Sequence, residues 1–175
     1  MQETANPIAL RYRRMILDAF AALTRTTPYG EITILRIVQE ADVSRQTFYR
    51  HFRSKDEILA AMLQRIADGV TERLQSLQQP TRREIFATYL SFWRENADFL
   101  RIVCEGHVES RLIARYGEIM REKLDILRPH FAALSEREFD LMKSFLIGGL
   151  YQLKADWYAQ GFEEEPDFLA ALLDK

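Results

Sequence analysis

The sequence predicts an all-α protein of about nine helices. Apolar residues recur at spacings of three and four along almost the whole of the 175-residue chain, and helix-starting side chains precede most of these runs. The alternation of polar and apolar residues that marks a half-buried strand hardly appears. Five Pro and seven Gly leave few interruptions, and 47% apolar residues are enough for a buried core.

Three helices are predicted before residue 53. Asn6 caps the first, which begins at Pro7 and ends at the segment "TPYGE" over 27–31. Thr33 caps a second over 34–41, the segment "DVS" makes a tight turn, and Ser44 caps a third helix that reaches about Phe52.

Six further helices follow. Ser54, Thr81 and Ser135 each have a Glu three residues later, which is the capping box that begins a helix. We expect two domains, an N-terminal one over 8–63 and a C-terminal one over 64–175. The six helices are predicted at about 55–78, 82–95, 97–106, 108–127, 136–160 and from Pro166 toward the end of the chain.

Charge is distributed unevenly along the chain. Residues 1–60 hold nine Arg and Lys against seven Asp and Glu, whereas residues 61–175 hold fifteen against nineteen. We therefore expect the N-terminal part to meet a polyanion. The single Cys104, the absence of a leader segment and an apolar stretch at 144–153 that is too short to span a membrane indicate a cytoplasmic protein.

The stretch "SRQTFYRHFRSK" over 44–55 holds four cations and a His without an acid. Helical periodicity turns Phe48 and Phe52 inward and a polar arc outward, and this arc can bond base edges and phosphates in the major groove of DNA. Lys55 at a helix start opposes the helix dipole, which predicts a phosphate bound there. The alternative for such charges is a solvated helix face. The outward arc consists of Gln46, Thr47, Tyr49 and Arg50.

The segment "ITILRIVQEADVSRQTFYRHFRSKDEILAAML" over 32–63 resembles the DNA-binding signature of the TetR family of bacterial transcriptional regulators. Two positions depart from the family pattern: Asp42 stands where Gly is usual, and the bulky Val38 stands where Ala is frequent. Asp tolerates a left-handed backbone, so we expect the turn to form with slight strain. The resemblance implies that Arg45 and Gln46 read bases, that Thr47 contacts base or phosphate, and that Thr33, Tyr49, His51 and Lys55 contact phosphate; the helical wheel adds Arg50.

Other N-terminal cations are less defined. Arg11, Arg13 and Arg14 lie near the start of the first helix, where they contact DNA or form a solvated surface. Arg53 has no role beyond general attraction to DNA.

The central helices carry many large and polarisable side chains. They can line an apolar pocket for a small-molecule effector, which the resemblance implies, or fill a solid core, and both interpretations stay open. The candidates for the pocket lining are Tyr89, Phe92, Trp93, Cys104, His107, Tyr116 and Met120, with Phe99 nearby.

The last two helices carry apolar stripes that suggest a dimer surface. A helix-turn-helix that reads a two-fold operator needs a two-fold dimer, and the resemblance implies a four-helix bundle. The segment 153–173 is also similar to a subgroup that includes regulators of dihydroxyacetone kinase genes. The predicted dimer stripes are Leu146, Gly149, Leu150, Leu153 and Trp157, followed by Phe168, Leu169, Leu172 and Leu173.

These features together predict a ligand-responsive repressor that binds a palindromic DNA operator as a homodimer and is released by a small molecule. We expect no cofactor, metal or membrane partner. The sequence has no Glu-x-x-His pair, P-loop, Cys-x-x-Cys or Gly-x-Ser-x-Gly motif, which argues against an enzyme. The alternative is a helical interaction protein of the same fold without DNA binding or ligand switching.

Overall fold

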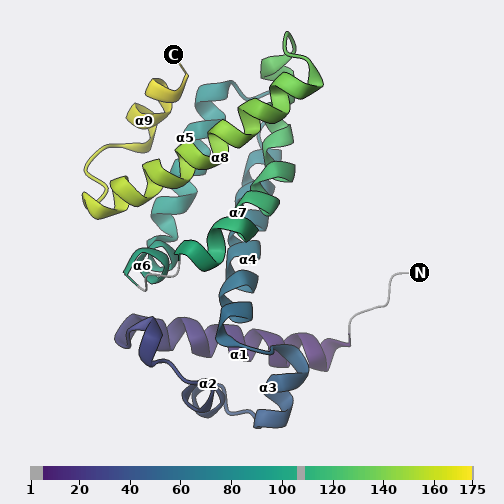
Figure 1. Ribbon diagram of the computed structural model, residues 1–175, viewed down its shortest axis with the longest axis vertical. Helices are drawn as coiled ribbons and strands as arrows, with labels where there is room; N and C mark the ends of the chain where they lie inside the picture. Colours follow the sequence, from purple (N-terminus) through teal and green to yellow (C-terminus); the bar gives the residue numbers. More distant parts are fainter. Residues whose placement is uncertain (1–5, 106–108, 175) are drawn as a thin grey trace. The chain divides into compact units, whose positions relative to one another are not determined.

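A computed structural model of the chain describes residues 6–105 and 109–174 (Figure 1). Over these residues it contains nine α-helices, two 3₁₀ helices and no strand, which confirms the predicted all-α fold. The chain forms two compact units, Met1–Leu63 and Gln64–Lys175.

The first unit contains three helices and the start of a fourth. α1 (Pro7–Thr26) is followed by the 3₁₀ helix η1 (Tyr29–Glu31), α2 (Ile34–Glu40) and α3 (Arg45–His51), and α4 (Lys55–Gln75) begins here. α1 packs on both α2 and α3, which also contact each other (Figure 1). The core of the unit is made by fully or almost fully buried side chains: Ile16, Phe20, Ile37, Phe48, Phe52 and Ile58.

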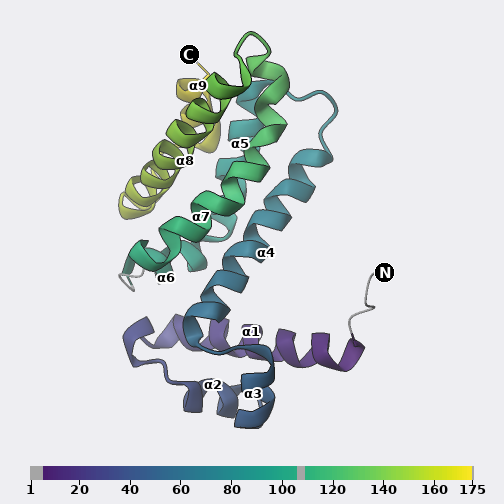
Figure 2. The ribbon, with the colours of Figure 1, turned by 45° about the vertical axis from the view of Figure 1, so that its right-hand side comes forward.

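The second unit is a helical bundle (Figure 2). Beside the rest of α4 it holds α5 (Arg82–Glu95), α6 (Ala97–Glu105), α7 (Glu109–Lys123), η2 (Leu124–Phe131), α8 (Glu136–Ala159) and α9 (Pro166–Leu173). α6 and α7 pack on α8, and α9 packs on α5. None of the helices in the described part of the chain is long and apolar enough to cross a membrane.

Most helix starts follow the predicted caps. The Ser54 start differs, because the Glu57 carboxylate accepts from the Arg53 N–H at 2.7 Å while the Ser54 hydroxyl oxygen accepts from the Glu57 N–H at 3.2 Å. α4 also ends at Gln75, before the predicted end at 78. The side chains that cap as predicted are Asn6, Thr33, Ser44, Thr81 and Ser135, and the last two form full capping boxes.

Two other boundaries differ from expectation. α6 ends at Glu105, just before the predicted end at 106, and the Asn96 side chain before it donates to the Phe92 carbonyl at the end of α5, 2.8 Å away. α7 ends at Lys123 and gives way to η2, which contains Pro129. Because proline has no N–H and clashes with the carbonyl four residues earlier, the α-helical bonds cannot continue up to it.

Three arginines of α5 hold α9 and the segment around it. Arg82 Nε lies 2.9 Å from Asp174 Oδ1, and Arg94 Nη1 lies 3.0 Å from Glu165 Oε2. Arg83 pairs with Asp167. The C-terminal helix is therefore fixed to α5 by ion pairs as well as by packing.

Candidate functional site

The helix α3 presents a polar face that is held in place by buried aromatic rings. Phe48 is 0% and Phe52 is 2% exposed, whereas the large ring of Tyr49 is 55% exposed. Burial of the two phenylalanines fixes the rotation of the helix about its axis. The side chains that this rotation exposes are Arg45, Gln46, Tyr49 and Arg50, called here the α3 outer face.

Two threonines that are predicted to contact DNA, Thr33 and Thr47, form hydrogen bonds within the helix starts where they lie. The Ser44 hydroxyl oxygen accepts from the Thr47 N–H at 3.0 Å, and the two hydroxyls lie 2.9 Å apart. The hydroxyl of Thr47 is thereby held beside the start of α3, and its side chain is half-buried. Thr33 is exposed, and its hydroxyl oxygen accepts from the Arg36 N–H at 3.3 Å.

The turn between α2 and α3 forms as predicted. Asp42 adopts a φ of 51°, the left-handed conformation that glycine takes without cost. The Val43 N–H donates to the Val38 carbonyl at 3.0 Å and closes the turn. The bulky Val38 is accommodated, since its side chain is buried at 5% exposure.

His51 lies half-buried at the end of α3. Its ring centroid is 6.4 Å from that of Tyr12, and its Nε2 has no hydrogen-bond partner among the described residues. Burial lowers the pKa of His51, and the charges of Arg50 and Arg13 lower it further. The imidazole is therefore neutral at pH 7. Its contact with phosphate stays a prediction, and an adjacent phosphate would favour the protonated form.

The structure gives Lys55 an internal role in place of the expected phosphate clamp. Its Nζ donates to the carbonyls of Tyr29 at 2.7 Å and Ile32 at 3.0 Å, and it lies 4.4 Å from the Tyr29 ring centroid. Three carbonyl oxygens, including that of Gly30 at 3.4 Å, surround the ammonium. They compensate for its position at a helix start, so the ammonium needs no phosphate there.

The arginines of α1 divide between packing and solvent. The guanidinium carbon of Arg13 lies 4.5 Å from the Phe52 ring centroid, so this side chain helps to cover the core. Arg11 and Arg14 are exposed.

In the second unit, aromatic side chains from α5 and α7 surround a lysine of α8 that was not predicted as a functional residue. Lys154 is 2% exposed, and its Nζ lies 3.7 Å from the Trp93 ring centroid and 4.2 Å from that of Tyr116. It donates to the Tyr116 hydroxyl oxygen at 3.0 Å, and that oxygen lies 2.9 Å from the hydroxyl oxygen of Tyr89. Three of the predicted pocket residues, Tyr89, Trp93 and Tyr116, thus form one compact cluster with Lys154.

A sequence signal for Lys154 existed. It follows Leu150 by four residues and precedes Trp157 by three, which places it on the buried face of α8. Burial lowers the pKa of Lys154 well below its usual value and raises the pKa of Tyr89 and of Tyr116. Both phenols therefore keep their protons at neutral pH. The described residues contain no group of three or more His, Cys, Asp or Glu placed to hold a metal ion.

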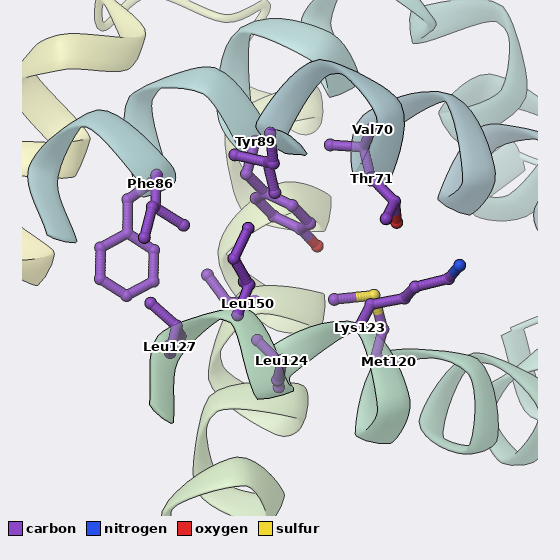
Figure 3. Close-up of a pocket in the computed structure, with 12 residues that line it drawn as sticks. Val70, Thr71, Phe86, Tyr89, Met120, Lys123, Leu124, Leu127 and Leu150 are labelled. Carbon is purple, nitrogen blue, oxygen red and sulfur yellow. The ribbon is translucent and has the colours of Figure 1, made fainter. Parts of the chain in front are cut away.

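A small cavity lies beside this cluster (Figure 3). Its volume of about 20 Å³ has room for about one water molecule. Its walls come from α4, α5, α7, η2 and α8, and they are mostly apolar. The lining residues are Val70, Thr71, Leu74, Ile85, Phe86, Tyr89, Met120, Lys123, Leu124, Ile126, Leu127 and Leu150.

Only Tyr89 and Met120 of the predicted lining residues line this cavity. Trp93 and Tyr116 pack around Lys154 instead, and Phe92 packs over Gly69, where an added Cβ would lie 2.7 Å from the Phe92 ring. Phe99 is buried in the core, at 3% exposure, and Cys104 is half-buried in α6. His107 lies outside the described residues.

The predicted dimer stripe mixes core and surface residues. Leu146, Leu150 and Trp157 are at most 9% exposed within the single chain, so these three side chains belong to its core. Leu153 and Leu173 are half-buried, and Leu169 is buried. The sequence reasoning missed Leu141 and Phe145 because it followed the wrong side of α8. The apolar residues that are exposed on α8, namely Leu141, Phe145, Gly148 and Gly149, and those exposed on α9, namely Phe168 and Leu172, are together called here the α8–α9 outer face.

Known structures share this fold. A dihydroxyacetone kinase operon activator, DhaS, superposes with a TM-score of 0.66 at 16% identity, covering 92% of this chain and 90% of that chain. FadR of Thermus thermophilus, a TetR family transcriptional repressor in complex with lauroyl-CoA, superposes with a TM-score of 0.64 at 20% identity, covering 91% of this chain and 89% of that chain. The likeness to DhaS agrees with the one expected from residues 153–173.

Sequence comparisons point the same way. The nucleoid occlusion factor SlmA of Shewanella amazonensis is 26% identical over 129 residues, which is 66% of each chain. The chain spans about two thirds of the length of the first curated relatives it matches. Residues 16–62 match the family described as "Bacterial regulatory proteins, tetR family", and residues 81–175 match its transcriptional regulator C-terminal region. With the second match covering more than half of its residues, the chain belongs to the TetR family of bacterial transcriptional regulators.

Proposed function

We propose that this regulator acts in the cytoplasm as a homodimer that binds a palindromic DNA operator, represses transcription and is released by a small molecule. The α3 outer face carries the proposal. Two arginines and a glutamine are exposed together on a helix whose opposite side is fully buried. Arg can bond guanine and Gln can bond adenine in pairs, which is direct readout in the major groove.

The proposed contacts divide by chemistry. Gln46 and Arg50 read base edges, and Arg45 reads a base at the start of α3. Thr33, Thr47, Tyr49 and His51 contact phosphates, which fix the register of the protein on the duplex. Lys55 supports this surface by holding η1 to the start of α4 rather than by binding phosphate itself.

Selection of duplexes from a random pool tests DNA binding and yields the operator sequence. Gln46→Ala and Arg50→Ala should each relax the preference at particular base pairs, whereas a lost phosphate contact weakens all sequences alike. Arg53→Ala is the matched control, because it removes a neighbouring exposed cation without an assigned base. If no duplex is enriched at low salt, the alternative of a helical interaction protein without DNA binding stands.

The α8–α9 outer face supports the homodimer. Phe145 is 74% and Phe168 is 57% exposed in the single chain. A Cβ added at Gly148 or Gly149 would meet no atom of this chain within 4 Å, so no internal packing requires these glycines. Two glycines in the middle of a helix each cost about 1 kcal/mol relative to alanine, and close approach of a second helix can offset this cost.

We assign effector binding to the second unit, residues 64–175. Support comes from the cavity lined by apolar residues and from FadR, a repressor of the same family crystallised with lauroyl-CoA. Effector binding would shift the population of α4 positions and alter the spacing of the two recognition helices. Measurement of operator affinity with and without a candidate effector tests this step, and equal affinities would remove it.

A further inference from the structure

Lys154 differs from the other buried lysine of its unit. Lys143, 8% exposed, lies 2.9 Å from Asp125 Oδ1 and 3.0 Å from Asp140 Oδ1. Lys154, 2% exposed, has no carboxylate within ion-pair distance in the described part of the chain. A buried ammonium is costly unless it is paired. The faces of Trp93 and Tyr116 favour the charged form but carry no negative charge.

The hydrogen bonds around Lys154 have a direction. Lys154 Nζ donates to the Tyr116 hydroxyl oxygen at 3.0 Å. The oxygens of Tyr116 and Tyr89 lie 2.9 Å apart and either hydroxyl can donate, so Tyr116 can pass its hydrogen to the Tyr89 oxygen. With Tyr116 as that donor, the hydrogen of Tyr89 is free for a further acceptor. Lys154, Tyr116 and Tyr89 thus form a relay, called here the hydroxyl relay, that ends in a polarised O–H donor.

The end of the hydroxyl relay lies in the wall of the cavity. Tyr89 lines it, and in Figure 3 the Tyr89 hydroxyl lies toward the side where Thr71, Met120 and Lys123 gather. The Thr71 hydroxyl already donates to the Ala67 carbonyl at 2.7 Å. Lys123 Nζ already pairs with Asp68 at 3.1 Å. Tyr89 is therefore the lining donor that is both deeply buried and still in need of an acceptor.

We infer that the effector is an apolar monocarboxylate whose carboxylate accepts the hydrogen bond of Tyr89 and supplies the negative charge that Lys154 lacks. This inference rests on the proposed effector-binding role of the second unit. A carboxylate would favour the charged form of Lys154, which burial disfavours, whereas a neutral carbonyl would accept the bond without doing so and a dianion would bring one charge too many. The hydrocarbon body would lie along Leu124, Leu127 and Leu150.

Binding requires the cavity to open, because about 20 Å³ holds no more than about a water molecule. Met120 forms part of the wall, and its unbranched side chain can change rotamer with little strain. An enlarged cavity would displace side chains of the helices that line it.

Calorimetry on the full chain without DNA tests the inference. The probes are octanoate, octan-1-ol and methyl octanoate, and the fluorescence of Trp93 in the cluster reports binding independently. We expect octanoate to bind at least about tenfold more tightly than the alcohol or the ester, as a charge-assisted hydrogen bond implies. Affinities for a series of acids from butyrate to dodecanoate show which hydrocarbon chain length the site binds most tightly. If no acid in the series binds more tightly than its alcohol, the inference is overturned.

Variants identify the binding group. Tyr89→Phe and Lys154→Met should each weaken octanoate binding by about tenfold or more and leave octan-1-ol binding unchanged. Tyr158→Phe is the matched control, since its hydroxyl bonds Glu105 outside the relay. Lys123→Met tests the alternative that the octanoate carboxylate binds Lys123, which also lines the cavity. The hydroxyl relay is refuted as the site if only Lys123→Met loses octanoate affinity. It is also refuted if Tyr89→Phe and Lys154→Met bind octanoate as tightly as the unchanged protein.

Two measurements separate this inference from the proposed function. Lys154→Met replaces the lysine by an apolar side chain of similar size, so its thermal melting should show an intact fold. Operator affinity is measured on the same proteins without ligand. Operator binding without selective carboxylate binding refutes only the relay, whereas absence of duplex binding refutes the proposed regulator.

Discussion

Replacement of Lys55 by Met should destabilise the first unit by about 2 kcal/mol. The substitution removes two short bonds to the carbonyls of Tyr29 and Ile32. Hydrogen bonds to a charged group contribute about 1.5–3 kcal/mol each. Both carbonyls are part-buried, so hydrogen bonds to water can replace some of this stabilisation in the variant. Loss of a cation from a helix start returns about 0.3–1 kcal/mol. The net loss of about 2 kcal/mol lowers the melting temperature by several degrees.

Denaturant unfolding of the full chain measures this loss, and amide hydrogen exchange in α2 and α3 localises it. Arg53→Met is the control, because it removes the neighbouring exposed cation and should leave the unfolding free energy nearly unchanged. Salt dependence of operator binding provides the second readout. A phosphate contact by Lys55 would reduce the slope of log K against log salt by about 1 in Lys55→Met. That reduction with an unchanged unfolding free energy would refute the internal role of Lys55.

Further predictions concern pH, backbone strain and assembly. Because its native pKa is lowered, His51 contributes stability that is complete above about pH 6.5 and is lost as pH falls through the native pKa. Urea unfolding across this pH range should show the loss, and His51→Gln should make the unfolding free energy less dependent on pH. Asp42→Gly should raise the unfolding free energy by about 0.5 kcal/mol and Asp42→Ala should lower it, as thermal melts can measure; the same sign for both would contradict the strain at φ 51°. Phe145→Asp should give a folded monomer in sedimentation equilibrium, whereas Leu150→Ala should cost about 2–5 kcal/mol of folding stability; a folded Phe145→Asp dimer would exclude this residue from the interface.

Local signals in the sequence predicted the first unit well. The side chains that cap α2 and α3 and the buried pair Phe48 and Phe52 depend on neighbours within a few residues, so periodicity and cap chemistry suffice to place them. Lys55 is the exception, because its carbonyl partners lie 23 to 26 residues away along the chain. No local pattern indicates that contact.

The second unit was predicted less well because its site depends on packing between distant segments. Tyr89 and Tyr116 lie 27 residues apart, and Lys154 lies 38 residues beyond Tyr116. Density of aromatic residues does not say which rings face a cavity and which surround a charge. On α8, the side of Leu150 and the side of Phe145 are both apolar, so periodicity alone could not separate core from surface.

The isolation of Lys154 bears on how the regulator can evolve. Most buried charges are fixed by their partners, because the loss of one leaves the other unpaired in the core at a cost of about 3–5 kcal/mol. Lys154 has no such partner in the described part of the chain, so its replacement by an apolar side chain strands no opposite charge. A single substitution could then convert a sensor of anions into a sensor of neutral hydrocarbons while the DNA-contacting unit remained untouched.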